Sequence, residues 1–250
     1  HESFTNEDGI VTCDECGFCL IAQVETADGE VTYYDGIATA LAAAAENEGS
    51  TLTLVSRIQV GNSVPISGGK FTVDLAGVPA KYKFNITGGD ITFKSSEEFS
   101  SDYSDRCDIT VNGSDAKVTI DGSVELTRII LYSGELTVNG DDANIATVNI
   151  SGGNAEISGT KIDAFRLHEG NAVLRDVTVA SFIAKTVSTT PDYTVTIESG
   201  SFDMIKFGDV EYDLGVALAR GRRVKKTDGT LLSYVTASGM TSDSNLIVEV

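Results

Sequence analysis

The chain has 250 residues and a formal net charge of −19. A surface that acidic repels the phosphate backbone of DNA and RNA, which argues against nucleic acid as a partner. Apolar residues make up 41 % of the chain, enough for a sizeable globular core, and no apolar run reaches the ~20 residues that a membrane-spanning helix needs.

The first chemical motif is CDECGFC (residues 13–19), in which three cysteines have the spacing C-x2-C-x2-C. A C-x2-C-G turn brings two thiolates to one Zn²⁺, because the glycine relieves the bend. A structural, tetrahedral zinc site would be completed by His1, Cys13, Cys16 and Cys19. A disulfide from Cys19 to one of the other two, or free thiols, are the alternatives that the sequence leaves open. Cys107 is distant and is expected to be a single thiol.

The next predicted element is a helix in DGIATALAAAAENEGS (residues 35–50). Its apolar residues share one face, and Gly49 is placed to end it. These face residues are Ile37, Ala40, Leu41 and Ala44. The helix directly precedes the first predicted strand, TLTLV (residues 51–55), and we expect it to cap the sheet that begins there.

From residue 64 to residue 204 a plain pattern recurs, in which apolar and polar residues alternate on both sides of a glycine. Around Gly153 the apolar positions are Val148, Ile150, Ala155 and Ile157. The same spacing is found around five more glycines, which are Gly69, Gly89, Gly134, Gly170 and Gly200. Alternation predicts strands with one buried face. Each copy is therefore two short strands that meet at a glycine corner.

Three of the separations between these glycines are 17 to 20 residues, the length of one coil of a β-solenoid. The gap of 45 residues would hold two coils, one of them disguised in 108–126, and the gap of 30 would hold one coil plus an excursion in 185–193. We predict an all-β chain that forms a single-stranded right-handed parallel β-helix with a short N-terminal capping helix. A β-sandwich also alternates, but it has no reason to keep glycine in one register.

The stretch 209–250 leaves this register. RRVKKTDGTLLSYV (residues 222–235) predicts a hairpin around Asp228 and Gly229, and NLIVEV (residues 245–250) predicts a last strand. We therefore divide the chain into three parts. They are 1–34, a cysteine knuckle with a strand pair; 35–208, the capping helix and parallel β-helix; and 209–250, a C-terminal β cap.

The order of these segments resembles the right-handed parallel β-helix domains of secreted or cell-wall proteins of Gram-positive, often gut, bacteria, within the pectate-lyase-like superfold. The resemblance is carried by CDECG (residues 13–17), DGEVTYYDGIATALAAAAENEGSTLTLV (28–55), SGGKFTVDLAG (67–77) and LGVALARGRRVKKTDGT (214–230). It implies a location outside the cell, secreted or on the cell surface, and a chain that is a piece of a larger protein. It implies little about activity, because this superfold hosts lyases, hydrolases and adhesins.

The resemblance implies that two kinds of catalytic site are possible, those of lyases and those of hydrolases. Lyases of this type abstract a sugar proton with an arginine or lysine beside Ca²⁺, and hydrolases use clustered aspartates. The weak catalytic candidates, on outward positions of the repeat, are Arg166, His168 and Arg175. The hydrolase set NTD, DD and GHG is present only as Asp141 and Asp142, in a sequence that also suits a turn. Turns such as NGSDA (112–116) and NGDDA (139–143) are candidates for Ca²⁺, although such turns form without metal.

The segment RGRRVKK (residues 220–226) holds five of the 18 basic residues and is suited to an acidic glycan or protein. The predicted binding residues are Arg220, Arg222, Arg223, Lys225, Lys226 and Tyr132. The leading functional prediction is a non-catalytic adhesion or stalk module that presents a solenoid face to host glycan or extracellular protein, with affinity from area and multivalency. A polysaccharide lyase or glycoside hydrolase, and an inert spacer, are the alternatives.

Overall fold

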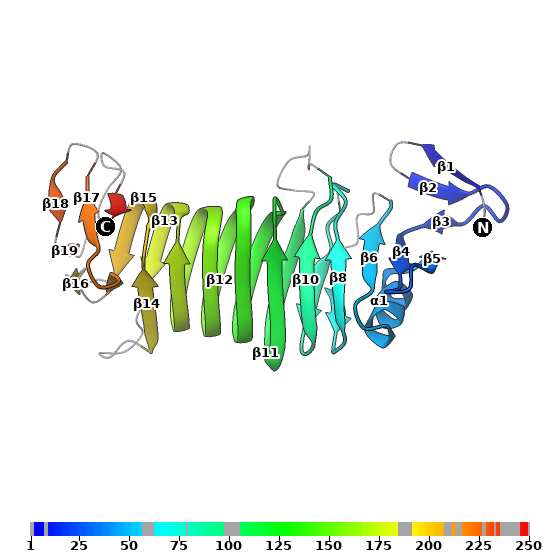
Figure 1. Cartoon of the computed structure of the whole chain (residues 1–250), viewed down its shortest axis with the longest axis horizontal. Coiled ribbons are helices and arrows are strands. Elements are labelled where there is room, and N and C mark those ends of the chain that lie inside the picture. The colour runs from blue at the N-terminus through cyan, green and yellow to red at the C-terminus, as the bar shows by residue number, and fades with distance from the viewer. Residues whose placement is uncertain are drawn as a thin grey trace.

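The computed structural model describes residues 3–7, 10–56, 63–78, 80–97, 106–184, 192–207, 212–213, 217–226, 229–232, 234–235 and 246–249. It is mostly strand (68 %) and forms a parallel β-solenoid of about seven turns. The stack is elongated, with the N-terminal elements at one end and the C-terminal strands at the other (Figure 1). The predicted parallel β-helix is confirmed, and the β-sandwich is excluded.

Short antiparallel strands form the N-terminal end. A separate sheet consists of β1 (Phe4–Glu7), β2 (Ile10–Cys13) and β3 (Cys19–Leu20). In the main sheet, β4 (Ala22–Glu25) lies between β5 (Val31–Tyr34) and β6 (Thr51–Leu54) and is antiparallel to both. The parallel stack begins where β6 meets β8.

Helix α1 (Ile37–Glu46) covers the start of the stack, as the sequence predicts. It buries Ala40, Leu41 and Ala44, three residues of the predicted face, and it contacts β4 through β8. The hydroxyl of Ser50 donates a hydrogen bond to the Ala44 carbonyl (3.0 Å). Gly49, at φ 79°, then turns the chain into β6. The helix shields apolar side chains that the first turn would otherwise expose.

Parallel strands build the body of the solenoid. In chain order they are β7 (Ser63–Ile66), β8 (Lys70–Asp74), β9 (Lys83–Ile86), β10 (Asp90–Lys94), β11 (Cys107–Asp121), β12 (Glu125–Arg175), β13 (Val177–Ala184), β14 (Tyr193–Ile197) and β15 (Gly200–Phe207). Strand β11 is the disguised coil: it pairs in parallel with β10 and β12, and its register shifts between Val111 and Lys117. The gap of 45 residues thus holds two coils, as predicted.

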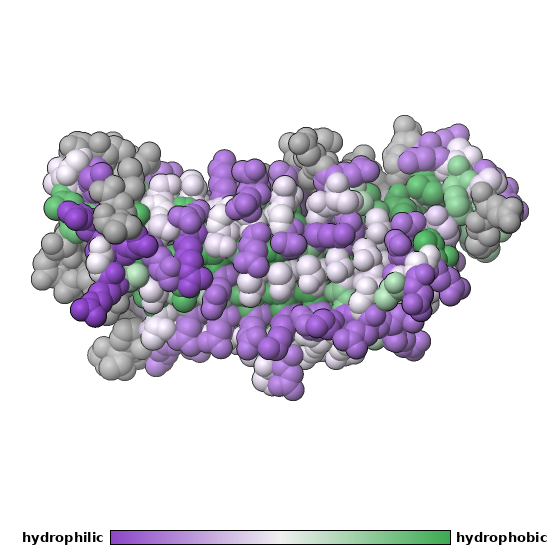
Figure 2. All heavy atoms as spheres, viewed as in Figure 1, coloured by the Kyte–Doolittle hydropathy of each residue, from purple (hydrophilic) through white to green (hydrophobic). Residues whose placement is uncertain are grey.

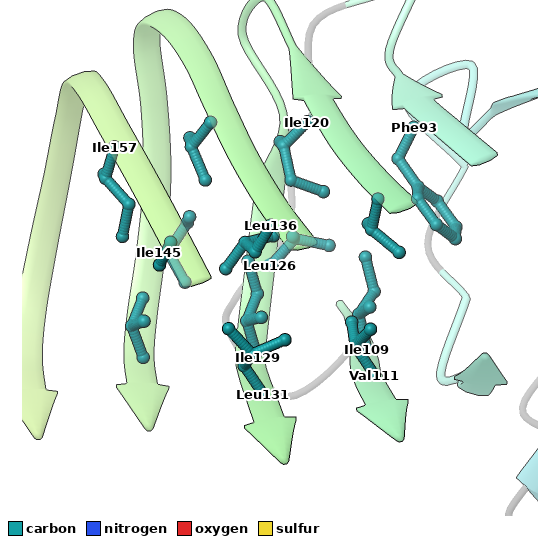
Figure 3. Packing of buried hydrophobic residues seen from close by; sticks show 14 of the residues in the cluster. Phe93, Ile109, Val111, Ile120, Leu126, Ile129, Leu131, Leu136, Ile145 and Ile157 are labelled. Carbon is teal, nitrogen blue, oxygen red and sulfur yellow. The ribbon is translucent and has the colours of Figure 1, made fainter. Parts of the chain in front are cut away.

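The core consists of inward side chains that follow one another from turn to turn. The first core row is Val64, Phe84, Ile109, Ile129, Val148, Phe165, Phe182 and Ile205. The second core row is Phe71, Ile91, Val118, Leu136, Ala155, Ala172 and Val195. All of these side chains are buried, and Figure 3 shows the packing around Ile109, Ile129 and Leu136.

A third core row was not predicted from the sequence. It is formed by Leu126, Ile145, Ile162, Val179 and Phe202. From Leu126 onward, each described turn therefore has three inward-facing segments, not the two that the alternation around glycine indicates. In these turns the third segment precedes the first, so this part of the solenoid has three faces around one apolar centre.

The glycine corners stack as a column. A Cβ atom on Gly89 would lie 2.7 Å from the carbonyl oxygen of Gly69, one turn earlier. Equivalent distances are 2.6 Å from Gly153 to Gly134 and 2.6 Å from Gly170 to Gly153. Five corner glycines have positive φ, from 72° to 95°, which are Gly69, Gly89, Gly134, Gly153 and Gly170. Glycine is therefore required there for both its conformation and the space it leaves.

The prediction for Gly200 is wrong. Gly200 is the register partner of Val177, and a Cβ on Gly200 would lie 2.5 Å from the Val177 carbonyl oxygen. Gly200 therefore begins the segment that contributes Phe202 to the third core row. Met204, which the glycine register places inside, is only partly buried. Tyr193 takes the place opposite Gly170. The residues 185–191 of the predicted excursion lie outside the described part of the chain.

Antiparallel strands close the C-terminal end. Their bounds are β16 (Tyr212–Asp213), β17 (Arg223–Lys225), β18 (Leu231–Leu232), β19 (Tyr234–Val235) and β20 (Leu246–Glu249). Strand β20 lies between β15 and β17, and β17 forms a hairpin with β18. The predicted hairpin and last strand are confirmed, while Asp228 itself lies outside the described residues.

Candidate functional site

The most regular surface is the front face of the solenoid as it is drawn in Figures 1 and 2. It carries the outward side chains of β6, β8, β10, β14 and the facing parts of β11 and β12. Figure 2 shows a pale central band on this face, with hydrophilic residues on both sides. No described helix is long and apolar enough to pass through a membrane.

A row of alternating charges follows the glycine corners along the front face. This charged row is Lys70, Asp90, Lys117 and Glu135, which are register partners on successive strands. The Lys70 Nζ–Asp90 Oδ2 distance is 3.4 Å, and the Lys117 Nζ–Glu135 Oε2 distance is 3.0 Å. The hydrogen bond to Glu135 and the negative charge of that carboxylate raise the pKa of Lys117. The row continues as an amide ladder, in which Asn171 Nδ2 donates to Asn154 Oδ1 (2.7 Å).

A threonine row occupies the centre of the same face. Its members are Thr51, Thr72, Thr92, Thr119 and Thr137. All of them are partly exposed, and successive members are register partners on neighbouring strands. Neighbouring strands lie about 4.8 Å apart, so the hydroxyls repeat at that interval along the solenoid axis.

A second group of charges lies at the end of the front-face strands. Arg175 Nε donates to Glu198 Oε2 (2.7 Å), and Arg175 Nη1 lies 3.4 Å from Glu156 Oε2. The hydrogen bond to Glu198 raises the pKa of Arg175, and the same bond lowers the pKa of Glu198. A guanidinium held by two carboxylates is a poor proton acceptor, which works against Arg175 as a catalytic base.

The three weak catalytic candidates are not brought onto one surface. Arg166 and His168 are outward residues of the strand that carries Phe165 inward. Arg175 follows the corner at Gly170 and belongs to the front face. Among the described residues, cavities of about 220 and 190 Å³ lie around Tyr33 and around Leu41, and none of the three candidates lines either of them.

The predicted binding residues are also separated. Tyr132, 49 % exposed, lies on β12 in the middle of the stack. The basic segment 220–226 lies at the C-terminal end, where Arg220 and Arg223 are exposed and the other three basic side chains are partly buried. After the hydrogen bond from Arg175, the charge of Arg222 is a further cause that lowers the pKa of Glu198.

The structure brings together two of the predicted metal ligands. The backbone N–H of Cys13 donates to the Phe18 carbonyl (3.0 Å), and that of Gly17 donates to the Cys13 carbonyl (2.8 Å), which closes a tight turn. Burial raises the pKa of the Cys13 thiol, but hydrogen bonds from the backbone N–H groups of Cys16 and Glu15 and from the Cys16 thiol make the net shift downward.

Cys19 stands apart from this pair. It is the register partner of Thr12, so its side chain is on the opposite face of the hairpin from Cys13, and it is exposed. His1 lies outside the described residues. Within the described ranges, no three His, Cys, Asp or Glu side chains gather in a way that could hold a metal ion.

Cys107 is a buried free thiol. Its Sγ donates to the Ala80 carbonyl (3.1 Å), and burial raises its pKa to about 12. A thiol with so high a pKa is inert at neutral pH, which fits a structural residue.

Sequence reasoning missed the charged row and the threonine row, although a signal for both was present. In KFTVD, DITFK, KVTID and ELTVN a charged residue is followed by an apolar residue and then by threonine (70–74, 90–94, 117–121 and 135–139). The repeated order places like residues on like positions of successive turns.

No family model, no curated protein and no solved structure matches the chain.

Proposed function

We propose that this chain is an extracellular, non-catalytic adhesion or stalk module that presents its front face to host glycan or protein. The observation that carries the proposal is the regular front face, on which hydroxyls, amides and paired charges repeat from turn to turn. The secreted or cell-surface setting in a Gram-positive bacterium rests on the resemblance of the segment order alone.

The chemistry of this face favours a glycan over a protein as the ligand. The threonine row and the amide ladder offer hydroxyl and amide groups, which form hydrogen bonds with sugar hydroxyls. The lysines of the charged row are already engaged with carboxylates, so little free charge remains there to select an ionic ligand. The core of a typical protein–protein interface is more apolar than this surface. A chain of sugars along the solenoid axis would gain affinity from many weak, equivalent contacts.

A glycan array tests the adhesion proposal. The wild-type chain is expected to bind at least one class of extended glycan. Thr92→Val/Thr119→Val should weaken that binding about tenfold, because two hydrogen bonds are lost while side-chain shape is kept. Arg222→Ala/Arg223→Ala separates a contribution of the basic segment from that of the front face.

Thr110→Val/Thr147→Val is the matched control, since both threonines lie outward on a different face. This control should bind like wild type. A wild-type chain that binds no glycan and no extracellular protein contradicts the proposal and leaves the inert spacer. Turnover of a uronic-acid polymer, lost in Arg166→Ala, would show a lyase instead.

We further propose that Cys13 and Cys16 hold a structural zinc ion. The sequence also predicts His1 and Cys19 as ligands, but the strand pairing turns Cys19 away from this pair, and His1 lies outside the described residues. The support is the C-x2-C spacing and the tight turn that backbone hydrogen bonds close at Cys13, because such a turn brings two cysteines to one zinc ion. Protein purified without chelator should contain about one zinc per chain. Cys13→Ser should lose that zinc, and Cys107→Ser should retain it. A zinc-free wild type, or a mass lower by two hydrogens, contradicts the proposal, the latter in favour of a disulfide.

A further inference from the structure

Charge is distributed unequally between the two ends of the molecule. Residues 1–50 contain eleven aspartates and glutamates and no lysine or arginine. All of those carboxylates that the structure describes are exposed. The segment 220–226 contains five basic residues and no acidic one. The two regions lie at opposite ends of the long axis (Figure 1), so one end of the solenoid is acidic and the other carries a basic patch.

Exposed apolar side chains are found at the same two ends. Among the described residues, five large apolar side chains are exposed. Ile10 (44 %) lies in β2, Phe18 (61 %) in the turn between β2 and β3, and Val31 (43 %) in β5, all at the N-terminal end. Leu231 (57 %) lies in β18 at the C-terminal end, and Tyr132 alone lies in the body.

The main sheet ends in an edge strand at each of these places. In its order of strands, β5 is the last at the N-terminal end and β18 is the last at the C-terminal end. Among the described strands, each therefore has a neighbour on one side alone, and the backbone N–H and C=O groups of its other edge are a template for pairing with another chain. Val31 belongs to β5 and Leu231 to β18.

We propose that copies of this chain associate end to end, with β18 and the basic segment 220–226 of one copy against β5 and the acidic N-terminal strands of the next. Opposite charges favour this arrangement, whereas two acidic ends repel each other. The contact is heterologous and does not close, so it extends the solenoid axis into a filament. The partner is a second copy of this chain, and the inference does not depend on whether the front face binds a glycan.

Sedimentation velocity over a concentration series tests this inference. At about 20 mM NaCl the weight-average sedimentation coefficient of the wild type should rise with protein concentration, and at about 500 mM NaCl it should fall to the monomer value because surface charges are screened. A wild type that stays monomeric at low salt and high concentration overturns the inference.

Charge reversals locate the contact. Arg220→Glu/Arg223→Glu should weaken association about tenfold or more. Lys83→Glu/Lys161→Glu changes the net charge equally, at exposed positions in the body, and should associate like wild type. Adding Asp28→Lys/Glu30→Lys to the first variant should restore association. An equal loss in both double variants, or no restoration, contradicts a contact between these ends. Circular dichroism confirms that each variant is folded.

Discussion

Gly153→Ala is expected to lower the free energy of unfolding by about 3–5 kcal/mol. At φ 72° an alanine carries backbone strain of about 1–2 kcal/mol. The new Cβ would also lie 2.6 Å from the Gly134 carbonyl oxygen, a backbone atom of the adjacent turn. That oxygen cannot move without separating the two turns, so the ladder on both sides of the corner is disturbed. Urea unfolding followed by circular dichroism measures the loss.

Gly122→Ala is the control for this substitution. Gly122 has the same φ of 72°, but a Cβ there would meet no atom within 4 Å. It should cost only the backbone strain of about 1–2 kcal/mol. If the two variants are equally stable, the close approach of successive glycines is not what the corner requires, and the column of corners is wrong.

Phe182→Ala is expected to cost about 3–5 kcal/mol, because a fully buried ring is removed. Phe182 stacks on Phe165 of the previous turn, with ring centroids 5.2 Å apart and an interplanar angle of 6°. It also contacts Phe202 and Phe207, at centroid distances of 6.1 and 5.5 Å. The substitution leaves a cavity among aromatic rings from consecutive turns. Thermal and urea unfolding give the magnitude.

Tyr132→Ala provides the contrast for Phe182→Ala. The Tyr132 side chain is 49 % exposed, so its truncation should change stability by no more than about 0.5 kcal/mol. A small effect at Phe182, comparable with that at Tyr132, would contradict the placement of Phe182 in the first core row.

The sequence predicts the first and second core rows because alternation and a fixed glycine occur together, as around Gly153. It does not predict the third row, since its residues follow turns such as NGDDA (139–143), where alternation is short and turn residues dominate. Gly200 was misplaced for a related reason. Glycine is also required where a backbone passes close to Val177, so glycine alone does not identify one corner of the turn.

The candidate site was less predictable than the fold, because proximity in sequence does not tell which face a residue occupies. Arg166 and Arg175 are nine residues apart, yet the corner at Gly170 sends them to different faces. Cys19 has the spacing of a ligand, but its strand pairing with Thr12 turns it away from Cys13. The charged row depends on the register between turns, which is visible only once the coils are aligned.

Zero-length carbodiimide crosslinking with peptide mapping tests the stacking of turns most directly, since it joins a lysine only to a carboxylate in contact with it. If successive turns stack in parallel, crosslinks will form from Lys70 to Asp90 and from Lys117 to Glu135, whose side chains lie 3.4 and 3.0 Å apart on successive turns. Persistence of both products at high dilution would show that they form within one chain. Crosslinks from these lysines to carboxylates of unrelated turns, with neither predicted product, would contradict the parallel solenoid.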